Sequence, residues 1–311
     1  MVEIYRTDQQ VLSTLPDIQD GCWINMVDPT SKELEQIAER FEIEPEDIAS
    51  ALDEEESSRI SLEDGYTLIL VDIPTPEVRH EKKMYTTIPL GIILKSDAII
   101  TVCKVDTPII NYFIRNKVRE FSTKKKMRFI YQMLFRSAFV YQANLRLIDK
   151  KRIEIEERVD GDTSDTDLIE LHELESTLVY FATSLRANRV VLERLSHYKR
   201  LQQYPDDIEL LEDVVVETQQ AIEMASIYKD IINGTRELLS SVLNSRLNNV
   251  MKYLTSITLV MAFPTVISGL YGMNVAGMPF ANDINGFMII CVMIIVICIV
   301  VAFWLKRNKM L

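Results

Sequence analysis

The stretch that decides the fold reads "YLTSITLVMAFPTVISGLYGMN" and runs from Tyr253 to Asn274. It carries no charged side chain, and a second uncharged run, "GFMIICVMIIVICIVVAFWL", follows at Gly286–Leu305. Each run is close to the ~20 residues that a helix needs to cross ~30 Å of hydrocarbon. A helix of this length in a soluble protein is seldom apolar on every face. We therefore predict two transmembrane helices, at about 253–271 and at 286–305.

Basic residues stand at only one end of each run. Four of them flank the pair, namely Lys252, Lys306, Arg307 and Lys309. The loop between the runs, residues 272–285, has no Lys or Arg, and Asp283 is its single acid. Because Lys and Arg gather on the cytoplasmic side of membrane proteins, we expect both termini in the cytoplasm. The sequence thus predicts a multi-pass plasma-membrane protein with an extracellular loop and a basic cytosolic tail at 306–311.

The first run differs from the second because it carries a stripe of small or mildly polar side chains. At helical spacing the stripe contains Met251, Thr255, Thr258, Ala262, Thr265, Gly269 and Gly272. Small residues let membrane helices approach closely, so the stripe is either a packing face or a wall that faces water. Two spans cannot enclose a pore, so a water-facing stripe requires a cyclic homo-oligomer.

Composition excludes several classes of function. The chain has 311 residues and a formal net charge of -12, and the charge lies almost entirely before the membrane runs. An acidic soluble part argues against nucleic acid as a partner and is compatible with attracting cations. The four cysteines form no CxxC pair and the three histidines are scattered, which argues against a zinc site of the usual spacing. Without a glycine-rich phosphate motif or a nucleophile–base arrangement, the sequence does not predict an enzyme.

The part before the membrane divides at about residue 122. Residues 1–122 alternate short strands with short helices, including a strand at Cys22–Val27 and one at Gly65–Pro74 that we expect Pro74 to stop. Residues 123–205 read as an antiparallel pair of long helices, and residues 206–271 as a stalk helix that becomes the first span. The predicted fold class is an α+β membrane protein: a cytosolic mixed α/β domain, a long helical stalk and two C-terminal transmembrane helices.

At "YGMN" (Tyr271–Asn274) the chain resembles the CorA family of magnesium transport proteins. The signature of that family, Gly-Met-Asn after the first of two C-terminal spans, matches Gly272, Met273 and Asn274. The resemblance covers the whole chain, including "LDEEESSRISLEDGYTLILVDIP" (52–74), "SSVLNSRLNNVMKYLT" (240–255) and the basic tail. It implies a homopentameric channel that moves Mg²⁺ and is gated by cytosolic Mg²⁺. The partners it implies are other copies of the same chain and the membrane lipid, and no other protein.

The resemblance also implies roles for individual residues. Asn274 would form a ring of amides at the outer mouth, and Thr258 would line the axis. The family's pore positions match Asn248, Met251, Leu254 and Thr265. "YKDIING" (Tyr228–Gly234) matches the segment of a regulatory magnesium site, so that Asp230 would pair with Glu77 or, alternatively, with Asp72 of a neighbouring subunit. The residues of an inner basic ring would be Lys306, Arg307 and Lys309.

Two departures and several alternatives accompany this interpretation. The loop lacks the acids that often follow the motif, which leaves Asp283, and Glu237 stands where relatives carry Asp. Asn274 is alternatively a helix C-cap, the three sensor acids are alternatively solvated surface acids, and Met251 with Leu254 alternatively forms helix core. A transporter of Co²⁺, Ni²⁺ or Zn²⁺ is a rival function, although few His or Cys lie near the pore. A membrane-anchored scaffold without transport is a second rival.

Overall fold

The structure is a computed structural model that describes residues 1–9, 11–79, 82–115, 117–118, 120–158, 165–197, 205–273, 278–280, 284–308 and 310. It divides into two compact units, Met1–Arg236 and Glu237–Leu311. The first unit contains a mixed sheet with helices, and the second contains two apolar helices joined by a loop. The predicted fold class, a mixed α/β domain followed by a long helix and two apolar C-terminal helices, is therefore confirmed.

The first unit is built on a seven-stranded sheet with the order β2-β1-β3-β7-β6-β5-β4. The strands are β1 (Val2–Asp8), β2 (Val11–Thr14), β3 (Cys22–Val27), β4 (Arg59–Glu63), β5 (Tyr66–Arg79), β6 (Lys82–Lys95) and β7 (Ala98–Cys103). Only β3 and β7 pair in parallel, and the other neighbours are antiparallel. The buried strand β7, with Ala98–Cys103 covered along its whole length, lies next to the long β5–β6 hairpin.

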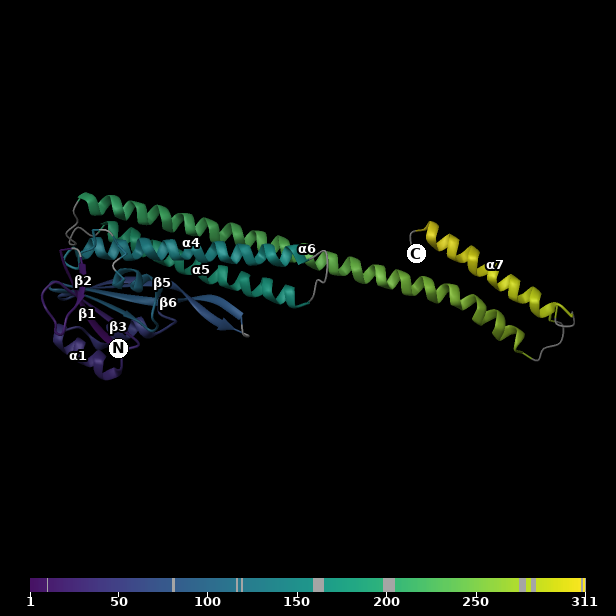
Figure 1. Cartoon of the computed structure of the whole chain (residues 1–311), viewed down its shortest axis with the longest axis horizontal. Helices are drawn as coiled ribbons and strands as arrows, with labels where there is room; N and C mark the ends of the chain where they lie inside the picture. Colours follow the sequence, from purple (N-terminus) through teal and green to yellow (C-terminus); the bar gives the residue numbers. More distant parts are fainter. Residues whose placement is uncertain are drawn as a thin grey trace. The chain divides into compact units, whose positions relative to one another are not determined.

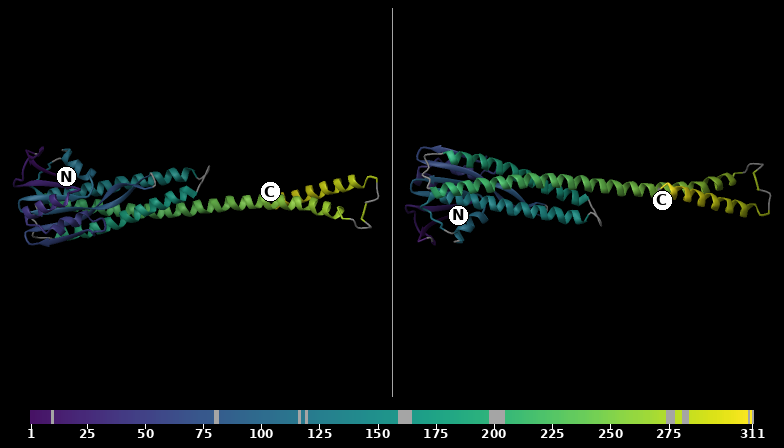
Figure 2. Two further views of the ribbon diagram at one scale, coloured as in Figure 1. Left: turned by 90° about the horizontal axis from the view of Figure 1, so that it is seen from below. Right: turned by 90° about the horizontal axis from the view of Figure 1, so that it is seen from above.

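Helices cover both faces of this sheet (Figure 1). On one face lie α1 (Ser31–Phe41), α2 (Pro45–Ala49) and the 3₁₀ turn η1 (Ser50–Leu52). On the other lie α3 (Pro108–Ile114), α4 (Lys126–Glu157), α5 (Asp165–His197) and the first part of α6 (Pro205–Tyr271). The core of this second face contains Trp23, whose indole Nε1 donates to the Thr101 hydroxyl at 2.8 Å and whose ring packs edge-on against Phe129. The paired α4 and α5 run side by side in both views of Figure 2.

The prediction that Pro74 stops its strand is wrong, because β5 continues through Pro74 and Pro76 to Arg79. β4 begins at Arg59, opposite Leu70, so the part of β5 after Leu70 has a sheet neighbour only on the β6 side. The backbone N–H and carbonyl of Asp72 point to the edge of β5 that has no neighbouring strand. There they form hydrogen bonds with the side chain of Asn188. Alternation along the strand points the nitrogens of Pro74 and Pro76 to the same edge. A missing donor is tolerated there because no ladder bond is lost.

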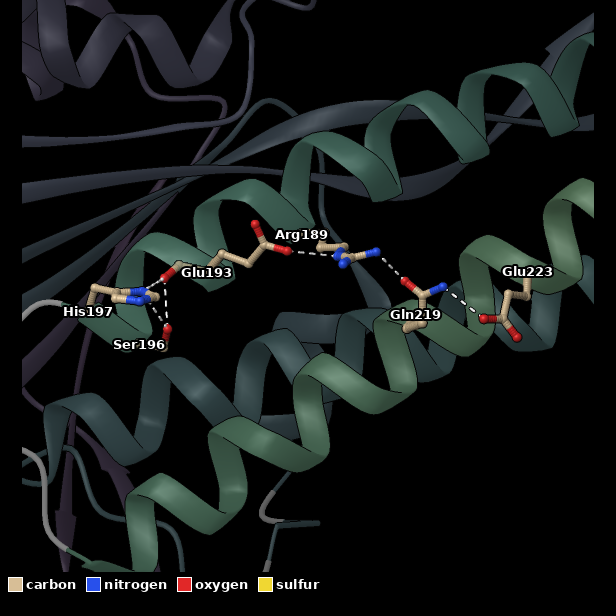
Figure 3. A network of polar contacts seen from close by, with 6 residues as sticks. All are labelled: Arg189, Glu193, Ser196, His197, Gln219 and Glu223. Carbon is tan, nitrogen blue, oxygen red and sulfur yellow. Dashed lines mark hydrogen bonds and ion pairs between the residues drawn. The ribbon is translucent and has the colours of Figure 1, made fainter.

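Helices α5 and α6 are joined laterally by polar side chains (Figure 3). Arg189 of α5 contacts Glu193 one turn along its own helix, and also donates to the side-chain oxygen of Gln219 on α6. Gln219 in turn donates to Glu223 at 2.8 Å. Helix α6 is thereby attached to the helical layer of the first unit.

In the second unit, the end of α6 and helix α7 (Gly286–Arg307) lie side by side. The hydroxyl of Ser256 on α6 donates to the Met310 carbonyl at 2.8 Å, and Ser256 is fully buried. Farther along, the Cys298 thiol of α7 lies 3.8 Å from the Val260 carbonyl of α6. Gly286 opens α7 where any Cβ would lie 2.0 Å from the Phe280 carbonyl oxygen, so the close turn before α7 requires glycine.

Candidate ion path and candidate sensor acids

The membrane part of α6 has a covered face and an uncovered face. Facing α7 are Ser256, which is buried, and the half-buried Val260, Pro264, Ile267 and Tyr271. At 100° per residue these positions span about 80° of the helix. The predicted stripe lies on the other side: its members from Met251 to Gly272 are all exposed within this chain.

The predicted pore residues fall inside this uncovered sector. Met251, Leu254, Thr258 and Thr265 span about 60°, centred about 150° from the face that contacts α7. All four are exposed within the chain, and so is Asn248 at the end nearer the first unit. The stripe is therefore not the surface by which the two helices of one chain pack together. It remains available to other copies of the chain or to water.

The hydroxyls on this side are held by the helix backbone. Thr258 Oγ1 donates to the Leu254 carbonyl at 2.8 Å, and Thr265 Oγ1 donates to the Met261 carbonyl at 2.9 Å. Ser268 Oγ donates to the Thr265 carbonyl at 3.1 Å. A hydroxyl that donates its proton inward keeps its oxygen lone pairs as acceptors on the exposed side. The stripe thus presents oxygen acceptors, which suit the hydrogens of water molecules around a cation.

At its C-terminal end, α6 terminates at Tyr271, directly before the Gly-Met-Asn motif. The Gly272 N–H donates to the Ser268 carbonyl at 2.9 Å, and the Met273 N–H donates to the Leu270 carbonyl at 3.2 Å. Both Gly272 and Met273 are exposed. The predictions for Asn274 and Asp283 lie outside the described residues, so their roles rest on the sequence.

At the opposite end, the last turn of α7 carries Lys306 and Arg307, both exposed. The Met310 N–H donates to the Leu305 carbonyl at 3.1 Å, and the Met310 carbonyl accepts from Ser256. The chain after α7 is thus fixed against α6 close to the two basic residues. The prediction for Lys309 lies outside the described residues.

Ser256 was not predicted to have a role of its own, although its bond to Met310 connects α6 with the end of α7. The sequence does not distinguish this serine from the neighbouring threonines of the same apolar helix. Only the position of the chain end shows that Ser256 lies on the α7 side while Thr255 and Thr258 lie on the other.

The two alternative sensor acids on β5 have different surroundings. Asp72 and Glu77 are five residues apart on one strand, so their side chains point to opposite faces. The Asp72 carboxyl bonds to Ser184 and Ser58 within the chain, and burial raises its pKa above the ordinary value of 3.8. Its carbonyl also accepts from the Tyr141 hydroxyl at 3.1 Å and from Asn188 at 2.7 Å. Asp72 is therefore an interior carboxyl engaged by its own chain.

Glu77 and Asp230 differ from each other in exposure. Glu77 is half-buried on β5 opposite Met84 of β6, and Asp230 is exposed on α6. Among the described residues, no group of three or more His, Cys, Asp or Glu side chains is placed to hold a metal ion. A metal site that includes Asp230 therefore needs ligands from a second copy of the chain or from water.

These features define a class: membrane proteins with a mixed α/β domain, a long helix leading into the bilayer, and two C-terminal spans with an uncovered polar stripe. A family model described as "CorA-like Mg²⁺ transporter protein" matches residues 19–307. The chain belongs to the CorA family of divalent-cation transport proteins.

Individual relatives agree with this assignment. The chain is 28% identical over 295 residues to the cobalt/magnesium transport protein CorA of Methanocaldococcus jannaschii, covering 92% of this chain and 90% of the relative. The structure of the complete CorA magnesium transporter from that organism matches with a TM-score of 0.84 and 26% identity, over 99% of this chain and 98% of that one. A zinc transport protein, ZntB of Yersinia pseudotuberculosis, is 36% identical over 73 residues, which cover 24% of this chain and 22% of ZntB.

Proposed function

We propose that this protein is a homopentameric channel that conducts Mg²⁺ across the membrane down its electrochemical gradient and closes when cytosolic Mg²⁺ is high. The observation that carries the proposal is the uncovered stripe of α6, which α7 leaves exposed within the chain. In a ring of subunits, five copies of this stripe would surround one axis. The relative named as a cobalt/magnesium transport protein, CorA of Methanocaldococcus jannaschii, supports Mg²⁺, with Co²⁺ as a further ion.

The chemistry of the stripe suits a hydrated ion. Mg²⁺ gives up its water reluctantly and keeps several waters in most protein sites. Hydroxyl and amide oxygens can accept hydrogen bonds from those waters without replacing them, and weak sites let an ion leave. Asn274 would supply such amides at the outer mouth, Met251 and Leu254 the apolar constriction, and Thr258 and Thr265 the acceptors between. The membrane potential supplies ~2.3 kcal/mol per charge per 100 mV, about twice that for a divalent ion.

The acidic first unit supplies the proposed sensor. With both termini in the cytoplasm, Mg²⁺ bound between Asp230 and an acid of the neighbouring subunit would hold the subunits in a closed ring. Glu77 is the first choice of partner because the resemblance aligns it with the family's sensor position, and Asp72, whose carboxyl is bonded to Ser184 and Ser58 of its own chain, is the alternative. When Mg²⁺ leaves, repulsion between the uncompensated carboxylates would favour opening.

Flux into proteoliposomes tests the path. Asn274→Ala should abolish Mg²⁺ uptake, and Thr265→Val, which removes only the hydroxyl, should slow it several-fold. Thr183→Val is the matched control, since the Thr183 hydroxyl makes the same bond to the carbonyl four residues earlier on the exposed side of α5. Uptake that survives Asn274→Ala, or that falls equally in the control, would refute the assigned path.

Two further measurements separate the rival functions. Comparing Mg²⁺, Co²⁺, Ni²⁺ and Zn²⁺ in the same assay decides the ion; preference for Zn²⁺ would favour the activity named for ZntB. The mass of the detergent-solubilised particle decides the assembly, since a dimer would favour a membrane-anchored scaffold. For gating, Asp230→Lys and Glu77→Lys should each weaken inhibition by internal Mg²⁺ while Asp72→Asn leaves it unchanged. If Asp230→Lys and Glu77→Lys give the same inhibition curve as the wild type and Asp72→Asn, the assignment of the sensor is contradicted.

A further inference from the structure

The first unit contains a cavity that the transport function does not use. It has a volume of about 480 Å³ and lies between α3, α4 and the start of α6. Its walls are mainly aromatic: Tyr112 and Phe113 come from α3, and Phe135 and Phe139 from α4. Cavities of this size with apolar walls and a few polar groups are typical of small-molecule sites.

A stacked cation forms one side of the cavity. The Arg136 guanidinium carbon lies 4.1 Å from the centre of the Tyr112 ring and 4.8 Å from the centre of the Phe139 ring. The two rings fix the guanidinium plane, so little conformational freedom remains to be lost when an anion binds. Lys117, which is exposed, adds a second positive charge to the lining.

Two polar atoms of the lining lack partners. Arg136 Nε and Gln132 Oε1 are both buried, and neither makes a hydrogen bond to any residue that the structure describes. They are four residues apart on α4, so they lie on the same side of that helix. A buried donor and a buried acceptor left unpaired are costly, and a ligand that supplies the missing partners would remove that cost.

The acids at this end of the unit are already engaged. Glu120 lies 2.8 Å and Asp207 lies 3.7 Å from the guanidinium nitrogens of Arg128, the cation two turns before Arg136. In the described part of the chain, no carboxylate forms an ion pair with Arg136. The cavity therefore has a cation without a protein counter-ion.

We propose that this cavity binds a small organic anion with a flat aromatic body. The anionic group would face the outer edge of Arg136 and Lys117, and the aromatic body would pack against Phe113, Phe135 and Phe139. This proposal does not depend on which ion the membrane part conducts.

Equilibrium dialysis of the full-length protein in detergent, with 1-naphthoate as the probe, tests the proposal. We expect saturable binding of one probe per chain. Two comparison compounds separate the contributions: 1-naphthamide keeps the aromatic body without the charge, and acetate keeps the charge without the body. Each should bind at least tenfold more weakly than 1-naphthoate.

Variants then locate the binding. Arg136→Met should lower the affinity for 1-naphthoate at least tenfold, whereas Arg189→Met, on α5 outside the cavity, should not change it. Gln132→Glu keeps the stacked guanidinium and places a negative charge beside it, so it should also abolish binding. If Arg136→Met fails to fold, the binding of 1-naphthoate by Gln132→Glu tests the proposal in its place. Absence of saturable binding, equal binding of 1-naphthamide, or unchanged binding by Gln132→Glu would overturn the proposal.

Discussion

Replacing Asn188 by Leu should destabilise the first unit more than the replacement of an exposed polar side chain does. Asn188 is 7% exposed, and its carboxamide acts as a strand neighbour for Asp72, which β4 does not reach. Its Oδ1 accepts from the Asp72 N–H at 2.8 Å and from the Ser58 hydroxyl at 3.0 Å, and its Nδ2 donates to the Asp72 carbonyl at 2.7 Å. Leu has a similar volume but offers neither donor nor acceptor.

The size of the loss follows from which groups remain paired. The Asp72 carbonyl still accepts a hydrogen bond from the Tyr141 hydroxyl at 3.1 Å, so it does not become an unpaired acceptor. The Asp72 N–H loses its partner in a buried place, at a cost of about 1–3 kcal/mol, while the Ser58 hydroxyl keeps the Asp72 carboxyl as an acceptor. A loss of about 1–3 kcal/mol corresponds to a fall of roughly 3–10 °C in melting temperature for a unit of this size.

Thermal unfolding of the full-length protein in detergent, followed by far-ultraviolet circular dichroism at one scan rate, measures this loss. Asn111→Ala is the matched control, because the Asn111 amide contacts only the exposed carboxylate of Asp106, which water can solvate. The control should melt within about 1 °C of the wild type. If Asn188→Leu also melts there, the carboxamide does not stabilise the strand edge and the reasoning fails.

Three other changes test separate parts of the structure. Asp72→Asn should raise the melting temperature at neutral pH, because burial raises the pKa of Asp72 and the wild type loses stability as pH rises through it. The advantage should shrink in acid, and a pH-independent difference would contradict this. Gly91→Ala should cost about 1–3 kcal/mol, because the new Cβ would lie 2.6 Å from the Ala51 Cβ; an unchanged denaturant midpoint would show that η1 moves freely. Ser256→Ala should cost about 0.5–1.5 kcal/mol by removing the bond to Met310, and should speed carboxypeptidase digestion of the tail; equal digestion rates would argue against that anchor.

Features that depend on neighbours in the sequence were predictable. The two apolar helices follow from composition alone, since hydrocarbon excludes charged side chains over a fixed thickness. The cap of α1 is equally local, since Thr30 and Glu33 form a reciprocal pair of hydrogen bonds within one turn of the helix. The family motif also lies in a contiguous stretch, so Gly272, Met273 and Asn274 were recognisable without coordinates.

Features that depend on distant partners were not predictable. Pro74 read as the end of a strand, because the sequence does not show that β4 leaves that edge of β5 free. Glu77 was preferred by the resemblance and Asp72 was the alternative, and only the folded chain shows that the Asp72 carboxyl is bonded to the distant Ser58 and Ser184 hydroxyls. The cavity around Arg136 is formed by aromatic rings from both α3 and α4. The sequence around each ring does not show that the two helices bring these rings together.

For α6, the sequence by itself determined that one side is a stripe of small and polar residues, because helical spacing is a local property. It left open whether that side packs against the second span. The tertiary structure decided that α7 takes the side of Ser256 and Val260 and leaves Thr258 and Thr265 uncovered. The physical reason is that packing between helices depends on pairs of surfaces, and among the described residues the chain after α7 bonds to α6 on the Ser256 side.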